Sequence, residues 1–440
     1  MLFVTGGIKE RRMKTAWKII GAILGIALIA MLVYGLRVWL AYNGFLDKIT
    51  DKEPETKSYS VLVLPDSNTN ELKELERKSI GYLKTDPKAG NAEQYLQSVV
   101  KHEASFYDDL GTLTGALGGR ISTAIVVESN WLETANEMIG EENNDLVNVE
   151  SVLKQGRIIH TFEIELESED VAPTEKDVTK EPFIAYISGS DSRSGVKATA
   201  RSDVNIVAVV NPAEAKILLV SIPRDTYVQL HGTTGLKDKL THAGVYGIDM
   251  SRQTIEDLLG IKIDGTLKVS FDTVVKVVDQ LDGIEINSDT AMKLKAEGKD
   301  KICEFVVGKQ KVDGDCALRF ARERKSYERG DRHRGENQQQ VITAIIAKLS
   351  GAKGYVLKLP SILEIAADSF ETSFSREDIS TMIRMQLLDN PKWQVESIAI
   401  DGTGTMLPTY SMGANLPLYV MIPSEETIVN AQNKINQFLK

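Results

Sequence analysis

Four short clusters in this 440-residue chain combine charged and hydroxyl side chains in the way that ligand-binding and catalytic sites do. The first, residues 188–193 (SGSDSR), directly follows an apolar run, and the second, residues 201–203 (RSD), leads into the next apolar run. The third, residues 221–225 (SIPRD), ends a third apolar run. The fourth lies far along the chain and comprises Arg322, Arg324, Asp331, Arg334 and Gln338.

The arginines in these clusters indicate phosphate chemistry. An arginine side chain presents a planar fork of donors that fits phosphate oxygens, and it stays protonated. Residues 319–334 hold seven basic side chains against three acidic ones, although the chain as a whole is acidic. Asp191 and Asp203 supply the hard oxygen ligands that Mg²⁺ prefers. We therefore predict a magnesium-assisted pyrophosphate clamp, whose arginines are Arg201, Arg224, Arg322 and Arg324.

Each cluster also has a simpler interpretation. An isolated Arg-x-Arg is usually a solvated strand or loop edge, and Asp225 could serve only to cap its loop or to pair with Arg224. His242 is more typical of a hydrogen-bonded structural histidine than of a ligand. The sequence contains no G-x-S-x-G, H-E-x-x-H or G-x-x-x-x-G-K-[ST] motif, which argues against a hydrolase elbow, a zincin and a P-loop.

The elements around these clusters predict an open α/β sheet. Residues 183–187, 204–210 and 216–222 are almost continuously apolar, as expected for strands covered on both faces. Helices are predicted at residues 251–259, 273–281 and 336–349, and extended segments at residues 268–271 and 283–286. Ligands gather outside the carboxyl ends of strands in such sheets, so the four clusters are expected to converge.

A second, smaller α/β unit is predicted before this one, at residues 58–166. Strands at residues 59–64, 79–83 and 122–127 alternate with helices near residues 71–78, 92–101, 110–117 and 131–138. Residues 167–182 are acidic, contain two prolines and lack apolar periodicity, which is typical of a linker. A spacer or protein-contact role is the simplest interpretation of the smaller unit, and residues 183–440 form the predicted catalytic domain.

The N-terminus predicts a membrane anchor. Residues 19–36 carry no charge, span about 27 Å as a helix, and are flanked by Trp17 and Trp39. Basic residues dominate before them, so residues 1–18 are predicted to be cytoplasmic, residues 19–40 to span the membrane and the rest to lie outside. A cleaved signal peptide is less consistent with the sequence that follows Leu36. A buried core helix is less consistent with the length of the apolar stretch and with its flanking residues.

Net charge and cysteine count exclude some classes of function. The net charge of −10 argues against a nucleic-acid binder, and two cysteines cannot form a disulfide scaffold or a four-thiolate zinc site. Outside the cytoplasm, Cys303 and Cys316 could form a disulfide, the alternative being two small buried apolar residues.

Taken together, the motifs resemble the LytR-CpsA-Psr family of extracytoplasmic phosphotransferases. The resemblance is close over residues 183–349 and rests on GSDSR, RSD, VNP, SIPRDTYV, KLTHA, VDQLDGIEI, DGDCALRFARER and the D-x-x-R formed by Asp331 and Arg334. The single anchor and the extra preceding unit resemble capsule-type CpsA members. The chain departs from the family pattern at three places. Cys316 stands where the family usually has a polar residue, and Phe320 stands where Tyr is common. Leu281-Asp-Gly replaces the usual double-glycine turn.

The resemblance implies a fold, a reaction and a set of site residues. It implies a central mixed sheet covered by helices, with an apolar tunnel for a prenyl chain. The implied enzyme transfers a glycopolymer, such as capsule polysaccharide or teichoic acid, from polyprenyl pyrophosphate to peptidoglycan through a phosphodiester bond. The implied metal ligands for Mg²⁺ or Mn²⁺ are Asp191 and Asp203. The implied pyrophosphate-binding residues are Arg201, Arg224, Arg322 and Arg324, supported by Asp331, Arg334 and Gln338, with Arg193 and Lys239 as weaker additions.

Two other functions remain open on the sequence alone. The same site could hydrolyse a polyprenyl pyrophosphate with water as the nucleophile. Alternatively, the protein could bind lipid without turnover and regulate envelope polymer assembly, with the smaller unit contacting assembly proteins. Transcription regulation is disfavoured, because only about 18 residues are predicted to face the cytoplasm.

Overall fold

The computed structural model describes most of the chain after the predicted anchor. The described residues are 33–50, 55–132, 153, 155–165, 176–190, 199–296, 298–350, 359–367 and 370–440. The cytoplasmic stub, most of the anchor, and two predicted site residues, Asp191 and Arg193, therefore lie outside the described residues. Residues 33–50 are helical, and no described helix is both long enough and apolar enough to cross a membrane.

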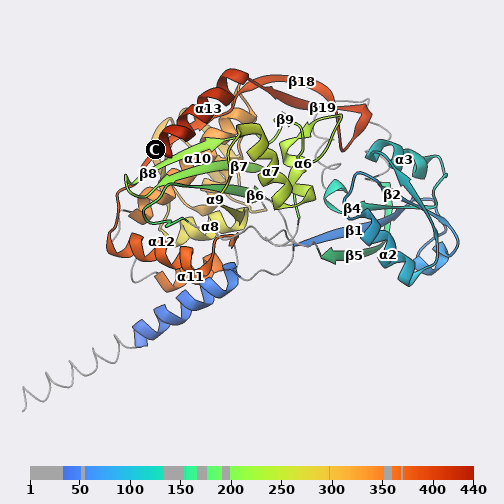
Figure 1. Cartoon of the computed structure of the whole chain (residues 1–440), viewed down its shortest axis with the longest axis horizontal. Coiled ribbons are helices and arrows are strands. Elements are labelled where there is room, and N and C mark those ends of the chain that lie inside the picture. The colour runs from blue at the N-terminus through green and yellow to red at the C-terminus, as the bar shows by residue number, and fades with distance from the viewer. Residues whose placement is uncertain are drawn as a thin grey trace, which may run out of the picture.

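The first unit along the chain is a five-stranded sheet with the order β3-β2-β4-β1-β5 (Figure 1). β2 runs parallel to β3 and β4, whereas β1 runs antiparallel to β4 and β5. Its helices are α2 (Ala89–Val99), α3 (Leu110–Gly118) and the short 3₁₀ helix η1 (Leu72–Leu75), where the sequence predicted a longer helix. The strands are β1 (Thr56–Val63), β2 (Ser79–Leu83), β3 (Glu103–Tyr107), β4 (Ala124–Glu128) and β5 (Arg157–Glu165).

The second sheet has six strands in the order β16-β11-β6-β7-β8-β17. β7 is antiparallel to both of its neighbours, whereas β6 pairs in parallel with β11 and β8 pairs in parallel with β17. The predicted mixed sheet is therefore confirmed. The strands are β6 (Phe183–Ser190), β7 (Val204–Asn211), β8 (Lys216–Ser221), β11 (Gly265–Ser270), β16 (Phe370–Thr372) and β17 (Gln394–Ala399).

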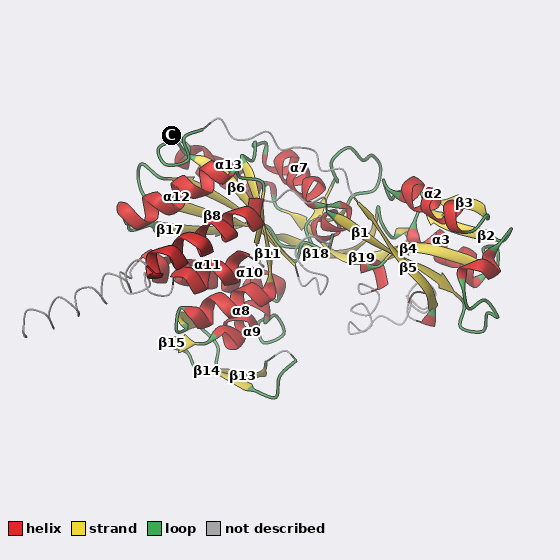
Figure 2. Cartoon of the chain, turned by 90° about the horizontal axis from the view of Figure 1, so that it is seen from below, coloured by secondary structure: helices red, strands yellow, loops and turns green. Residues whose placement is uncertain are grey.

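Helices cover both faces of this sheet (Figures 1 and 2). On one face, Val207 and Val209 pack with apolar side chains of α7 (Ile248–Leu259) and α13 (Glu425–Phe438). On the other face, Ile206 and Ala208 pack with side chains of α8 (Phe271–Gln280), α9 (Gly314–Arg322) and α10 (Asp331–Ser350). Because successive side chains of a strand point to opposite faces, the apolar run of β7 buries residues on both sides. The predicted helices correspond to α7, α8 and α10.

Smaller elements surround the second sheet. α11 (Leu359–Ala367) and α12 (Arg376–Leu388) follow α10, and α6 (Leu240–Ala243) and the 3₁₀ helix η2 (Gly244–Tyr246) precede α7. The two-stranded pairs comprise β9 (Tyr227–Val228) with β10 (Asp238–Lys239), β12 (Ile284–Ser288) with β15 (Gly308–Val312), β13 (Met292–Lys295) with β14 (Ile302–Phe305), and β18 (Gly402–Thr409) with β19 (Gly413–Pro423).

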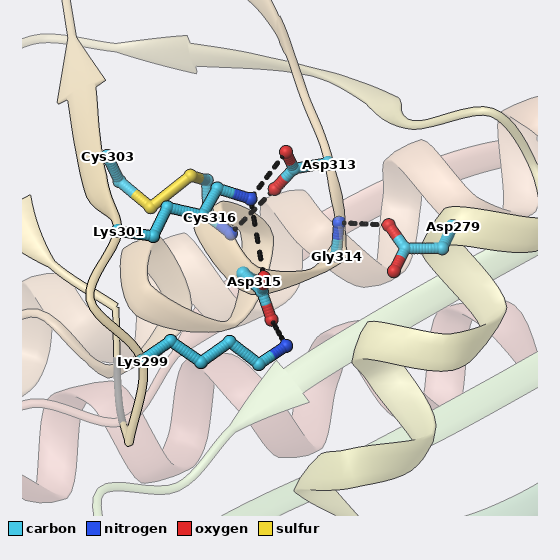
Figure 3. Close-up of a disulfide and its surroundings, with 8 residues drawn as sticks. All are labelled: Asp279, Lys299, Lys301, Cys303, Asp313, Gly314, Asp315 and Cys316. Atoms are coloured by element: carbon cyan, nitrogen blue, oxygen red, sulfur yellow. Dashed lines mark hydrogen bonds and ion pairs between the residues drawn. A yellow bond between two sulfur atoms is a disulfide. The ribbon is translucent and has the colours of Figure 1, made fainter.

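A disulfide joins Cys303 of β14 to Cys316 in the first turns of α9 (Figure 3). The pairing predicted as one of two alternatives is thus the one that the structure contains. Asp313 caps α9 by accepting a hydrogen bond from the Cys316 N–H at 3.1 Å. Gly314 donates its N–H to Asp279 of α8 at 2.8 Å, so the start of α9 is held from two sides.

The two sheets are joined through a shared apolar cluster. Leu110 and Leu113 of α3 pack with Met412 and Leu418 of the β18–β19 hairpin, which reaches across to the five-stranded sheet in Figure 1. The Leu110 N–H donates to the Ser411 carbonyl at 3.2 Å. The smaller unit therefore makes buried contacts with the larger one.

Candidate active site

The strand connections bring three of the predicted clusters together at one end of the central strands of the six-stranded sheet. Because β7 runs antiparallel between β6 and β8, the start of β7 lies beside the ends of both neighbours. The Asp203 N–H donates to the Gly189 carbonyl at 2.9 Å, and the Ile222 N–H donates to the Asn205 carbonyl at the same distance. Asp203 and Arg224 are thereby placed next to each other.

A buried ion pair forms the centre of the site. Arg224 Nη1 lies 3.0 Å from Asp203 Oδ1, and the two side chains are 13% and 12% exposed. Thr241 Oγ1 donates to the same carboxylate oxygen at 3.4 Å. Burial alone would raise the pKa of Asp203, but neighbouring guanidinium groups outweigh this effect and hold the pKa well below its usual range. Asp203 is therefore ionised at neutral pH.

The guanidinium groups that act on Asp203 come from three separate segments. They belong to Arg224 after β8, Arg201 before β7, and Arg334 in the first turns of α10. A Cβ atom at Gly335 would lie 2.8 Å from Ser221 Oγ, so the glycine allows α10 to approach the end of β8 closely. Two arginines of the predicted clamp and one predicted supporting residue are thus gathered around one carboxylate.

A second buried pair extends the site on the other side of Arg224. Lys239 Nζ donates to Asp225 Oδ1 at 2.9 Å, and Arg224 Nε lies 3.8 Å from Asp225 Oδ2. Burial raises the pKa of Asp225, but the charges of Lys239 and Arg224 outweigh burial and lower it. Asp225 pairs with Arg224, as the simpler interpretation proposed, and it also fixes Lys239 in the site.

Two arginines of the predicted clamp lie on α9 or directly after it. Arg322 is the last residue of α9, and its guanidinium lies 4.8 Å from the centre of the Phe271 ring. Arg324 follows in the loop that leads to α10, and Asp331 is the first residue of that helix.

An apolar cavity of about 330 Å³ adjoins this charged cluster. Its walls come from β6, β7, β11, β16, α8, α9 and α10, and almost all of its lining side chains are apolar. Arg322 and Gln338 are the polar side chains of the predicted site that line it. Gly189 and Val204 also line the cavity and flank Asp203, so the cavity and the ion pair share a boundary.

A network of hydroxyl groups that the sequence did not predict supports the start of β7. The Tyr186 hydroxyl donates to Asn205 Oδ1 at 2.7 Å and lies 3.0 Å from Ser202 Oγ. Ser202 Oγ also hydrogen-bonds to Ser188 Oγ. The available signal was the presence of small polar residues within apolar runs, which is too common in proteins to be specific.

The predicted metal site is only partly within the described residues. In that part of the chain, no three His, Cys, Asp or Glu side chains gather as they would around a metal ion, and Asp191 lies outside it. Asp203 offers the oxygens of an ionised carboxylate. Ser190 Oγ is buried without a hydrogen-bond partner among the described residues. An ionised carboxylate and an unpartnered hydroxyl at one sheet edge fit a cation that prefers oxygen ligands.

His242 has the structural role that the sequence predicted. It is 2% exposed, and its Nδ1 lies 2.7 Å from Asp238 Oδ1. Asp238 is fully buried and also accepts a hydrogen bond from the Ser411 N–H at 2.8 Å. This pair fixes the residue that precedes Lys239.

Comparison with known proteins gives a consistent result. The LytR_cpsA_psr family model matches residues 145–434. The chain is 32% identical over 266 residues to the polyisoprenyl-teichoic acid–peptidoglycan teichoic acid transferase TagU of Halalkalibacterium halodurans, covering 59% of this chain and 80% of that protein. It is 34% identical to the Enterococcus faecalis protein of the same name, covering 46% of this chain and 64% of that one. The crystal structure of protein gbs0355 from Streptococcus agalactiae shares the fold, with a TM-score of 0.50 at 24% identity over 59% of this chain and 88% of that chain.

Proposed function

The chain belongs to the LytR_cpsA_psr family, and on that premise we propose that it is a phosphotransferase that acts outside the cell membrane. It takes a glycopolymer from a polyprenyl-pyrophosphate carrier and joins it to peptidoglycan through a phosphodiester bond. The names of the relatives describe the transfer of polyisoprenyl-linked teichoic acid to peptidoglycan. Capsule polysaccharide and teichoic acid are the two polymer classes that we propose as cargo.

One observation carries this proposal: a cluster of buried and half-buried cationic side chains borders an apolar cavity. The cations that surround the two carboxylates belong to Arg201, Arg224, Lys239 and Arg334. Such a cluster suits the oxygens of a pyrophosphate, which need charge compensation away from water. The adjoining apolar cavity suits a prenyl chain. A lipid pyrophosphate combines these two chemical features in one molecule.

We propose that the reaction is an in-line displacement. The acceptor hydroxyl forms a bond to the sugar-linked phosphorus, the bond from that phosphorus to the bridging oxygen breaks, and polyprenyl phosphate leaves. The arginines stabilise the charge that develops on the leaving group. The hydroxyl proton passes to solvent, because the lowered pKa values of Asp203 and Asp225 make both carboxylates weak bases. A loose transition state needs little help from a base.

We assign a divalent cation, Mg²⁺ or Mn²⁺, to Asp203 together with Asp191. When bound there, the cation would neutralise phosphate oxygens and so make the pyrophosphate a better leaving group. The support for this assignment is the ionised state of Asp203 and the unpartnered hydroxyl of Ser190 among the described residues.

In this proposal, the protein is anchored in the cell membrane of a Gram-positive bacterium. Residues 19–40 cross the membrane, residues 1–18 lie in the cytoplasm, and the catalytic part, residues 183–440, lies outside. The disulfide between Cys303 and Cys316 supports an oxidising compartment. The five-stranded sheet would also present a surface to proteins that assemble the wall polymer.

The test is a transfer assay with the full-length protein. Detergent-solubilised protein is given a polyprenyl-pyrophosphate-linked glycan, Mg²⁺ and peptidoglycan fragments, and both polyprenyl phosphate and the glycan adduct are measured. We expect both products from the unmodified protein and a loss of about 100-fold or more in Arg224→Ala. The matched control is Arg252→Ala, which removes an arginine of α7 that pairs with Asp249 and Glu256. Release of polyprenyl phosphate without formation of a glycan adduct would contradict the transferase and indicate a hydrolase.

A further inference from the structure

The segment that carries Arg201 and Asp203 is held from both units of the molecule. On the side of the six-stranded sheet, the Ser202 N–H donates to the Thr241 carbonyl at 3.1 Å. On the side of the five-stranded sheet, the Thr199 N–H donates to the carbonyl of Thr56 at 3.0 Å, and Thr56 is the first residue of β1. Residues 199–203 therefore bridge the two units.

Asn130 provides a second contact from the five-stranded sheet. Its side-chain Nδ2 donates to the Thr199 carbonyl at 2.7 Å. The same amide hydrogen-bonds to Glu128 Oε1, and the Asn130 N–H donates to Glu128 Oε2 at 3.2 Å. Glu128 is the last residue of β4 and is 2% exposed. The Asn130 side chain is thus oriented by a buried carboxyl group at the end of a strand.

Close packing leaves the segment little room on its other side. A Cβ atom at Gly244 would lie 2.4 Å from the Ala200 carbonyl oxygen and 2.6 Å from the Ser202 nitrogen, so only glycine allows this approach. Thr199 is 3% exposed and Ser202 is 1% exposed. A displacement of Thr199 is therefore transmitted along the backbone to Arg201 and Asp203.

The residue after Asn130 makes another contact across the same boundary. Trp131 is 1% exposed, and its ring forms a T-shaped contact with His242, with centroids 5.1 Å apart. His242 is bound to Asp238, the residue before Lys239. The end of β4 therefore contacts both sides of the charged cluster, through Thr199 and through His242.

From these contacts we propose that Asn130, which follows β4 of the five-stranded sheet, is a positioning residue for the transfer reaction. It holds Thr199, and thereby places the Arg201 guanidinium and the Asp203 carboxylate beside Arg224. This inference rests on the proposed function for its catalytic meaning, whereas the positioning itself can be measured without turnover. It gives the five-stranded sheet a role inside the catalytic site.

The first test measures amide hydrogen exchange in the full-length protein. In Asn130→Ala, we expect the amides of residues 199–203 to exchange about fivefold faster or more, because one anchoring hydrogen bond is lost. Asn130→Asp keeps the side-chain shape without the N–H donor and is expected to change exchange in the same direction. The matched control is Gln97→Ala, whose Nε2 donates to the His102 carbonyl at 2.8 Å within the five-stranded sheet unit. Unchanged exchange at residues 199–203 in both Asn130 variants would overturn the inference.

The second test links the positioning to the ligand, with inorganic pyrophosphate and Mg²⁺ as the probe. We expect pyrophosphate affinity to fall about tenfold in Asn130→Ala and to stay unchanged in Gln97→Ala. In an Arg201→Ala background, the added Asn130→Ala change should have little further effect, because both changes act on one group. Fully additive losses would overturn the inference. If the unmodified protein bound no pyrophosphate, the proposed function would fail, while the exchange result would stand by itself.

Discussion

At the scale of single residues, the charge state of Asp203 depends on its arginine neighbours. A carboxylate with 12% side-chain exposure would normally favour its neutral form, because burial penalises charge. The surrounding guanidinium groups reverse this preference and lower the pKa. The stabilisation from these pairs is therefore present at neutral pH and is lost only as the pH falls through the lowered pKa. Asp203 is accordingly expected to remain ionised across the pH range in which envelopes function.

Arg324 gives a sharp prediction at this scale. Arg324→Ala should lower the rate of glycan transfer about 100-fold or more, because one cation of the proposed pyrophosphate clamp is removed. The fold should be retained, since Arg324 lies in the loop between α9 and α10. The measurement is the transfer assay together with thermal unfolding. The neighbouring exposed residue supplies the control, as Lys325→Ala should transfer normally. Equal activity in the two variants would remove Arg324 from the clamp.

Glu128 gives a prediction for the pH dependence of stability. Burial raises the pKa of Glu128 from its ordinary value of 4.5 to about 8, although the charge of Lys57 lowers it in part. Between these two values the folded state binds more protons at Glu128 than the unfolded state, so the contribution of this group to stability is greatest below pH 4.5 and falls as the pH rises towards 8. The slope from this group is at most about 1.4 kcal/mol per pH unit.

Urea unfolding at several pH values between 5 and 8 tests this dependence. The free energy of unfolding of Glu128→Gln should change less with pH than that of the unmodified protein, because glutamine does not titrate. Asp66→Asn is a suitable control, since Asp66 pairs with Arg120 at the surface, where both side chains are well exposed. Parallel curves for the unmodified protein and Glu128→Gln would contradict the raised pKa.

At the scale of elements, the buried strands were predictable and the edge strands were not. The apolar runs that became β6, β7 and β8 follow directly from the sequence, because strands covered on both faces need apolar residues at every position. β17 (QVESIA) pairs along only one side and mixes polar with apolar residues, so its pattern does not distinguish it from a loop. The antiparallel direction of β7 also depends on tertiary packing.

In the candidate site too, some features could be predicted from the sequence and others depend on tertiary packing. Motif spelling was sufficient to select Asp203 and Arg224, which the structure places 3.0 Å apart. The bond between Lys239 and Asp225 depends on the pairing of β9 with β10, in which Lys239 lies opposite Tyr227. No local pattern reports such a pairing of two-residue strands. The contact of Asn130 with Thr199 joins residues 69 positions apart and was equally inaccessible.

The disulfide gives the prediction for this scale. Cys303 and Cys316 are 13 residues apart, and for a loop of this size a disulfide contributes about 3 kcal/mol to stability by restricting the unfolded chain. Double replacement, Cys303→Ala with Cys316→Ala, should lower the free energy of unfolding in urea by about that amount. Ion pairs of Lys299 and Lys301 with the first turn of α9 remain in the variant (Figure 3).

Reductant provides the control for this experiment. The unmodified protein in reductant should approach the stability of the double variant, and reductant should leave the variant itself unchanged. Because the disulfide fixes the start of α9 and Arg322 ends that helix, transfer should fall as well. A protein whose stability is insensitive to reductant would show that the two cysteines are not paired in solution.

At the scale of the whole molecule, the two sheets and the helix before them form one connected assembly. Arg376 of α12 donates to Asn43 at 2.7 Å and pairs with Asp47, both in the helix of residues 33–50. Lys268 of β11 pairs with Glu55, just before β1, at 2.5 Å. The segment that follows the predicted anchor therefore contacts the larger unit before the chain enters the smaller one. In the proposed topology, these contacts would constrain the position of the active site relative to the membrane.

The antiparallel course of β6, β7 and β8 has a consequence for chain connectivity. The turn between β7 and β8 lies at the end of both strands opposite to Asp203 and Arg224, and its residues Ala213 and Glu214 are exposed. Exposed turns of this kind accept inserted sequence or new chain termini more readily than other positions. Sequence inserted at this turn would leave Asp203 and Arg224 at the intact opposite ends of the strands. This turn is therefore the natural place to attach a reporter without disturbing the chemistry.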